Sequence, residues 1–232
     1  MEHREIYLAG GCFWGIEHLM QQLPGVVEAQ SGYANGSGAA EANYRAVCGG
    51  DTGFREAVRV VYDPARVSLE ALLLAYFYVV DVTVAGRQGP DVGSQYQSGI
   101  YYEDAADAAV VERIAAIERA AAADFCVEIG PLRNFYPAEE YHQDYLQKNP
   151  FGYCHIPREE MRLLAALRID PGDYVKPAAE VVREKLGRGE HNEKQPPIGD
   201  CFFRLRTQQK PPEWVAFVLV AETGLEPATS GL

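Results

Sequence analysis

Apolar residues alternate with polar ones or recur at helical spacing as far as Ile129, and this pattern predicts a mixed structure. Runs rich in Val, Ile and Tyr predict strands over residues 5–9, 26–33, 56–62, 97–102 and 125–129. Apolar residues three or four positions apart predict helices over residues 12–23, 69–79 and 104–123. Ser68 is a suitable N-cap for the second helix. The Gly-rich stretches 34–43 and 82–95 predict loops.

Beyond Pro157 the character of the chain changes. Apolar spacing predicts two short helices, over residues 158–167 and 178–186. Charged and proline-containing segments follow, with too few periodic apolar positions to offset the entropy of ordering them. We therefore expect a folded domain over residues 1–157, a linker with short helices over 158–189, and a disordered tail over 190–232.

Strands that alternate with helices indicate an α+β or an α/β sandwich, and the pattern alone does not decide between them. The formal net charge of −12 argues against nucleic acid or an anionic membrane surface as a partner. The apolar run after Met1 is too short for a signal peptide, and Trp214–Ala221 is too short to span a bilayer. We expect a soluble, cytoplasmic protein.

The five cysteines are widely and irregularly spaced, which favours neither a disulfide framework nor a zinc site. Cys12 differs from the others in its position. A strand-like run ends at Gly10-Gly11, and Cys12 directly follows at the start of a predicted helix. The free N–H groups and the dipole of a helix N-terminus favour a thiolate over a thiol. Phe13 and Trp14 place two aromatic faces beside the sulfur, where an apolar substrate group could sit.

The segment Gly11-Cys12-Phe13-Trp14-Gly15 resembles the active-site signature of the A-class peptide methionine sulfoxide reductases. Further matching blocks follow in the family's order over residues 5–156: Gly32-Tyr33-Ala34, Asn43–Cys48, Asp51-Thr52-Gly53, Val60–Pro64, Arg87-Gln88-Gly89, Asp91–Tyr96, Phe135–His142 and Gly152–His155. The resemblance implies an α+β fold, a ferredoxin-like two-layer sandwich of a mixed sheet and helices with an extended C-terminal coil. It also makes residues 1–157 the catalytic domain.

The resemblance implies roles for individual residues. Cys12 would be the nucleophile, and Glu56 the acid that protonates the sulfoxide oxygen, because a buried carboxyl group keeps its proton near neutral pH. Tyr44 and Tyr96 would donate hydrogen bonds to the same oxygen. Asp91 would orient a water molecule or the peptide backbone.

Further implied roles concern the pocket and the second thiol. Phe13 and Trp14 would form the pocket for the substrate methyl group. Cys154 would resolve the Cys12 sulfenic acid to a disulfide. Phe54 and Arg55 replace a frequent His and a small residue of the family, and an inward-pointing Arg55 would lower the pKa of Glu56. Pro90 and Gln97 replace a frequent Asn and Arg.

The implied activity is thiol-dependent reduction of methionine S-sulfoxide, free and in oxidised proteins, as protein repair after oxidative damage. The chain would be a monomer without a bound cofactor, with thioredoxin, or dithiothreitol in vitro, as reductant. One alternative is a thiol-based redox sensor without turnover, which would not need Tyr44, Glu56 and Tyr96. Another is a Cys/His acyl transferase, but His18 lies too far along the predicted helix to reach Cys12.

The remaining cysteines and His142 receive plainer interpretations. Cys48 and Cys126 are predicted to be buried packing residues, and Cys201 lies in the expected tail. His142 follows Glu139 and Glu140, but a metal site would need a third ligand at suitable spacing. We therefore expect no metal.

Overall fold

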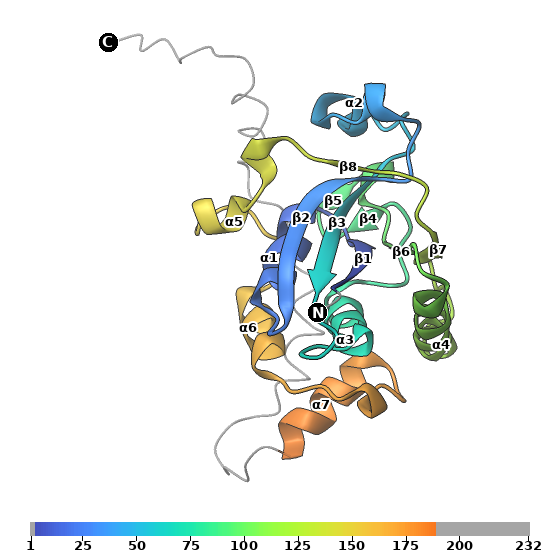
Figure 1. The fold of residues 1–232 in the computed structure, drawn as a ribbon, viewed down its shortest axis with the longest axis vertical. Coiled ribbons are helices and arrows are strands. Elements are labelled where there is room, and N and C mark those ends of the chain that lie inside the picture. Colours follow the sequence, from blue (N-terminus) through green and yellow to red (C-terminus); the bar gives the residue numbers. More distant parts are fainter. Residues whose placement is uncertain (1–2, 189–232) are drawn as a thin grey trace. The chain divides into compact units, whose positions relative to one another are not determined.

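The five strands expected from the sequence and a sixth that was not predicted, β8, form one sheet with helices packed on it. The computed structural model describes residues 3–188 (Figure 1). The sheet holds β1 (Arg4–Ala9), β2 (Val26–Ala34), β3 (Arg55–Tyr62), β6 (Gly99–Tyr102), β7 (Glu128–Pro131) and β8 (Phe135–Pro137). The strands β4 (Arg87–Gln88) and β5 (Asp91–Val92) pair separately. The α-helices are α1 (Phe13–Gln22), α2 (Tyr44–Cys48), α3 (Leu69–Val79), α4 (Ala105–Ala121), α5 (Tyr145–Lys148), α6 (Arg158–Ala166) and α7 (Ala178–Arg188).

The strand order β7-β6-β1-β3-β2-β8 contains a ferredoxin-like unit. In that unit β6, β1, β3 and β2 are neighbours and every adjacent pair is antiparallel. The strand β7 extends one edge in parallel with β6, and β8 extends the other edge antiparallel to β2. The implied α+β fold with a mixed sheet is therefore confirmed.

Side-chain alternation in β3 separates the two faces of the sheet. Glu56, Val58 and Tyr62 are buried, and Val58 and Tyr62 belong to the larger hydrophobic core with residues of α1 and α3. Ala57 belongs instead to a smaller cluster on the opposite face, together with Tyr7 and others. The catalytic candidates thus lie on the face that the helices cover.

The helix α3 shows how local sequence fixes an element. Ser68 accepts a hydrogen bond from the Ala71 N–H over 3.2 Å, so it caps the helix as predicted. The helix then runs over the predicted residues 69–79, almost all of them apolar, because it is buried against α4 and α7. On its other side the Tyr76 hydroxyl group donates to the carbonyl oxygen of Ala9 in β1 over 2.7 Å.

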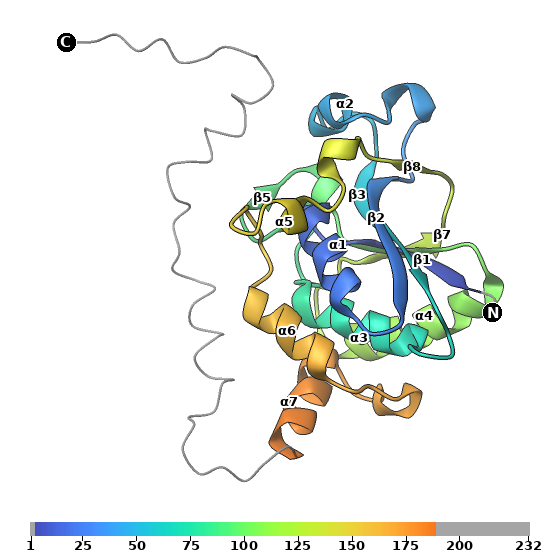
Figure 2. The same cartoon turned by 60° about the vertical axis from the view of Figure 1, so that its left-hand side comes forward.

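The linker with short helices was expected over 158–189, and its described residues, 158–188, contribute α6 and α7 to this body. The helix α6 packs against α1, and α7 packs against α3 (Figure 2). Glu118 of α4 accepts hydrogen bonds from Tyr174 Oη and from the Ala178 N–H, each over 2.7 Å. The expected tail at 190–232, with Cys201, lies outside the described residues.

Some sequence-based expectations need correction. The stretch 82–95, predicted to be a loop, contains the short paired strands β4 and β5. No element was predicted for residues 44–48, which form the helix α2 because the Asn43 side chain accepts a hydrogen bond from the Ala46 N–H and caps it. The strand predicted over 125–129 is observed as β7, which begins three residues later, at Glu128, because its pairing with β6 starts there. Cys48 is exposed at the end of α2, and Cys126 is half-buried, so the packing role predicted for both is wrong.

Among residues 3–188, no helix is both long and apolar enough to cross a membrane.

Candidate active site

Cys12 lies at the N-cap of α1, directly after β1 and the two glycines. Gly11 has a φ of +81°, and a Cβ atom there would lie 2.6 Å from Cβ of Gln88. A Cβ on Gly10 would lie 2.8 Å from Cδ1 of Ile16. The turn can therefore approach its neighbours only with glycine at both positions, which explains how the chain delivers a buried thiol to the helix start.

The expectation that Cys12 rests as a thiolate is wrong for this structure. Burial raises the pKa of the Cys12 thiol well above its usual value, and the nearby Glu56 and Asp91 add to the shift. A hydrogen bond from the Trp14 N–H opposes the shift but is outweighed. The thiol is therefore protonated at rest, and its proton must leave when the sulfur attacks.

Glu56 lies in β3, beside the N-terminus of α1. Its side chain is 1% exposed, and its Oε2 accepts a hydrogen bond from the Phe13 N–H over 3.1 Å. Burial raises the pKa of Glu56 to about 8, with a further contribution from Asp91. The expectation that this carboxyl group keeps its proton near neutral pH is confirmed.

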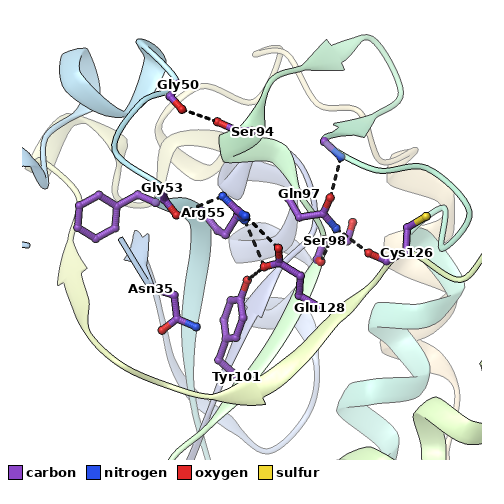
Figure 3. A network of polar contacts seen from close by, with 12 residues as sticks. Asn35, Gly50, Gly53, Arg55, Ser94, Gln97, Ser98, Tyr101, Cys126 and Glu128 are labelled. Carbon is purple, nitrogen blue, oxygen red and sulfur yellow. Dashed lines mark hydrogen bonds and ion pairs between the residues drawn. The ribbon is translucent and has the colours of Figure 1, made fainter. Parts of the chain in front are cut away.

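Arg55 does not contact Glu56, because neighbouring residues of a strand point to opposite faces. Its Nε donates to Glu128 Oε2 over 3.2 Å and its Nη2 to Glu128 Oε1 over 2.9 Å (Figure 3). Tyr101 Oη donates to the same carboxylate over 2.6 Å. These three side chains line a cavity of about 350 Å³ on the face away from Cys12. The lowering of the Glu56 pKa by an inward Arg55 is therefore not observed.

Tyr44 and Tyr96 come from α2 and from the 3₁₀ turn Ser94–Tyr96. Burial is the largest cause that raises the pKa of each phenol. Cys48 adds next to the shift of Tyr44, and Glu56 and Cys12 add to both shifts, so Tyr44, Tyr96, Glu56 and Cys12 lie within electrostatic reach of one another. Both phenols therefore remain proton donors at neutral pH.

Glu139 fixes the start of α2. Its Oε1 accepts from the Tyr44 N–H over 2.9 Å, and its Oε2 accepts from Tyr33 Oη over 2.8 Å. Tyr33 pairs with Glu56 across β2 and β3. Tyr44 is thus tied through Glu139 to the strand that flanks Glu56.

Phe13 and Trp14 form an aromatic cluster with residues from the C-terminal segment. Trp14 stacks on Tyr145 with ring centroids 3.6 Å apart, and Trp14 Nε1 donates to His142 Nδ1 over 3.2 Å. The His142 ring also lies 5.1 Å from Phe13 and 4.5 Å from Tyr44. Burial lowers the pKa of His142 to about 4, so this ring is neutral and can accept the indole N–H.

Asp91 and Cys154 complete the predicted set. Asp91 accepts a hydrogen bond from Tyr153 Oη over 2.9 Å, and burial raises its pKa to about 6. Cys154 is half-buried and is a free thiol, as is Cys12. After burial, Asp91 and Cys154 both add to the raised pKa of Cys12, and Asp91 also raises the pKa of Cys154, so the two thiols and this carboxylate lie within electrostatic reach of one another.

Sequence reasoning missed several residues that surround these groups. His142 was considered only as a metal ligand, and Tyr145 and Glu139 were given no role. His155 lies against the turn that carries Cys12: its ring is 3.0 Å from the position of a Cβ on Gly15. The only signal in the sequence for Glu139, His142 and His155 is their position inside the blocks that resemble the family, and Tyr145 lies outside these blocks.

His155 also bears on the acyl transferase alternative, which needs a histidine base. Its Nε2 lies 2.9 Å from the carbonyl oxygen of Gly10 and must donate, because a carbonyl oxygen only accepts. That nitrogen is therefore not available as a base. Within the described residues, no group of three His, Cys, Asp or Glu side chains could hold a metal ion.

The arrangement combines a buried thiol, a protonated carboxyl group, two phenols and a cluster of aromatic rings. The comparison with known proteins agrees with this chemistry. The family model for peptide methionine sulfoxide reductase matches residues 4–167, and the chain belongs to this family. Its solved relatives are A-class enzymes, and the chain is a methionine sulfoxide reductase.

Three solved structures illustrate the likeness. Reduced Mxr1 from Saccharomyces cerevisiae is 39% identical with a TM-score of 0.63, over 66% of this chain and 89% of that chain. Methionine sulfoxide reductase A of Corynebacterium diphtheriae is 37% identical with a TM-score of 0.59, over 67% and 84%. Mxr1 in an unusual oxidised form is 38% identical with a TM-score of 0.50, over 66% and 85%.

Proposed function

We propose that the protein reduces the S epimer of methionine sulfoxide, free and in oxidised proteins, with Cys12 as nucleophile and Glu56 as proton donor. The observation that carries this proposal is the buried Glu56, whose pKa is raised to about 8 beside a buried thiol. A carboxyl group that is protonated at neutral pH can donate to an oxygen on which negative charge develops.

In the first step the Cys12 sulfur attacks the sulfur of the substrate. The oxygen atom passes to Cys12, which becomes a sulfenic acid, and the sulfoxide is reduced to methionine. Glu56 would protonate the oxygen while Tyr44 and Tyr96 donate hydrogen bonds to it, and the proton that leaves the Cys12 thiol would restore the Glu56 carboxyl group. The proposed pocket of Phe13 and Trp14 would hold the methyl group, which is supported by the stacking of Trp14 on Tyr145.

In the second step the Cys154 thiol attacks the Cys12 sulfenic acid, and the oxygen leaves as water. A disulfide between the two residues results, and a dithiol must reduce it before the next turnover. We propose thioredoxin as this reductant, with dithiothreitol as its substitute in vitro. We also propose a cytoplasmic location, supported by cysteines whose irregular spacing suits a reducing compartment. We propose that the protein acts there as a monomer and repairs oxidised proteins.

A redox sensor would explain Cys12 and Cys154 alone. It would not explain why Glu56, Tyr44 and Tyr96, from three separate segments, lie within electrostatic reach of the thiol. The reductase proposal accounts for these groups as donors to the leaving oxygen.

Separate assays of the two sulfoxide epimers with thioredoxin test the proposal. We expect methionine to form from the S epimer and not from the R epimer, and the Cys12→Ser variant to form none. Equal rates with both epimers would contradict the specificity. Oxidation of Cys12 by peroxide without any methionine formation from either epimer would favour the sensor.

A further inference from the structure

We propose that His155 and Tyr153 form a clamp that holds Cys154 against the turn of Cys12, which makes His155 a positioning residue for the disulfide-forming step. This inference rests on the proposed function, because it concerns the second of its two steps.

The first arm of the clamp is His155. Its Nε2 donates to the carbonyl oxygen of Gly10 over 2.9 Å, and its side chain is only 4% exposed. The ring occupies the space that side chains would need at the two glycines on either side of Cys12. A Cβ on Gly11 would lie 3.2 Å from Nε2 of His155, and a Cβ on Gly15 would lie 3.0 Å from its Cε1. The imidazole therefore packs directly over the segment that carries Cys12.

The second arm is Tyr153, on the other side of Cys154. Its hydroxyl group donates to Asp91 Oδ2 over 2.9 Å. His155 Nδ1 lies 3.9 Å from the same Asp91 oxygen, so both arms converge on one carboxylate. Cys154 is thus fixed by its two chain neighbours, which each bind a group next to Cys12.

The clamp would assist the step in which Cys154 converts the Cys12 sulfenic acid to a disulfide. The Cys154 sulfur must reach the Cys12 sulfur, a sulfur–sulfur bond must form, and the sulfenic oxygen must leave as water. The two residues are far apart in the sequence, so without tertiary contacts the loop-closure entropy would oppose their meeting. Holding the attacking thiol near its target raises its effective concentration and the rate of this step. Methionine release precedes this step and does not need the clamp.

The test compares His155→Ala with the wild-type protein in a single turnover without reductant. Rapid quenching measures methionine formation, and trapping of sulfenic acid with a 1,3-dione measures how long that species survives. We expect methionine to form within about twofold of the wild-type rate, and the disulfide to form on the order of tenfold more slowly, in line with lost positioning. His155→Gln, which keeps an N–H donor at the end of its side chain, should recover much of that rate.

Matched variants keep the test decisive. His18→Ala, another histidine of the same region, should change neither step, and Tyr153→Phe should slow disulfide formation by removing the second arm. The inference is overturned if disulfide formation keeps its wild-type rate in both His155→Ala and Tyr153→Phe, or if the two steps slow equally. If His155→Ala does not fold, the Gln and Phe variants decide by the same criteria. Absence of methionine formation in the wild-type protein would instead overturn the proposed function.

Discussion

The Phe13 N–H donates to Oε2 of Glu56 over 3.1 Å, so the first helical residue after the nucleophile is bound to the candidate proton donor. This bond uses one of the free N–H groups at the start of α1. It therefore fixes the carboxyl group beside Cys12 rather than stabilising a thiolate. The resting site holds two protons, one on each of the groups that react.

The role of Glu56 can be tested through pH. Since its pKa is raised to about 8, Glu56 is protonated and able to donate below that pH and loses this ability above it. We expect the wild-type rate of methionine formation to fall above about pH 8. Glu56→Gln should lower the rate at pH 7 on the order of 10²-fold, and its own profile should lack that fall. The wild-type rate divided by the Glu56→Gln rate should therefore fall as pH rises. A quotient that stays constant when the assay is run from pH 6 to pH 10 would exclude Glu56 as the donor.

Arg55 should contribute to stability and not to catalysis. Arg55→Gln removes its ion pair with Glu128, whose side chain is 41% exposed, so the expected loss is about 1 kcal/mol or less in the free energy of unfolding. The pH profile of methionine formation should not change. Arg59→Gln, on the same face and paired with Glu5, is the matched control. A shift of the Glu56 profile in the Arg55 variant alone would show that the two side chains are coupled.

Glu17 is a buried carboxyl group outside the proposed chemistry. It is 1% exposed, accepts from the Ser31 N–H over 3.1 Å, and has a pKa raised to about 7 by burial. A group whose pKa is higher in the folded state stabilises the fold at low pH and loses that effect as pH rises through the folded value. The free energy of unfolding of Glu17→Gln minus that of the wild type should therefore increase from pH 5 to pH 8, by on the order of 1 kcal/mol. Urea unfolding at both pH values measures this change, and an unchanged or opposite difference would contradict the assignment.

Part of this account could be predicted from local sequence. The apolar run after Ser68 and the alternation of residues 56–62 are local signals, and both elements appear where they were expected. The same alternation places Arg55 and Glu56 on opposite faces. The start of β7 could not be predicted locally, because it depends on pairing with β6.

The site required more than local signals. The resemblance to the family implies roles for Cys12, Glu56, Tyr44 and Tyr96, which the fold brings within electrostatic reach of one another from distant segments. The protonated state of Cys12 could not be predicted from a helix start, because it depends on burial and on two carboxyl groups from elsewhere in the chain. The contact of His155 with the Gly10 carbonyl is likewise a product of tertiary structure.

The contribution of the last two helices can be tested by truncation. A chain that ends after Arg188 keeps all the contacts described above, and we expect its melting temperature and activity to match those of the full chain. A chain that ends after Pro157 loses the buried side chains of Met161, Leu164, Tyr174 and Val182. We expect that truncation to lower the melting temperature by several degrees or more, because it uncovers apolar surface on α1 and α3. Equal melting temperatures for both truncations would show that residues 158–188 are only a linker.

The most direct test of the central claim is a single turnover of the fully reduced protein with methionine S-sulfoxide and no added reductant, followed by counting methionine and mapping the thiols that are lost. We expect one methionine per chain, with Cys12 and Cys154 joined in a disulfide. Cys154→Ser should still release one methionine and retain a sulfenic acid on Cys12, whereas Cys12→Ser should release none. Methionine formation by Cys12→Ser, or a wild-type turnover that leaves the Cys12 thiol intact, would contradict the account.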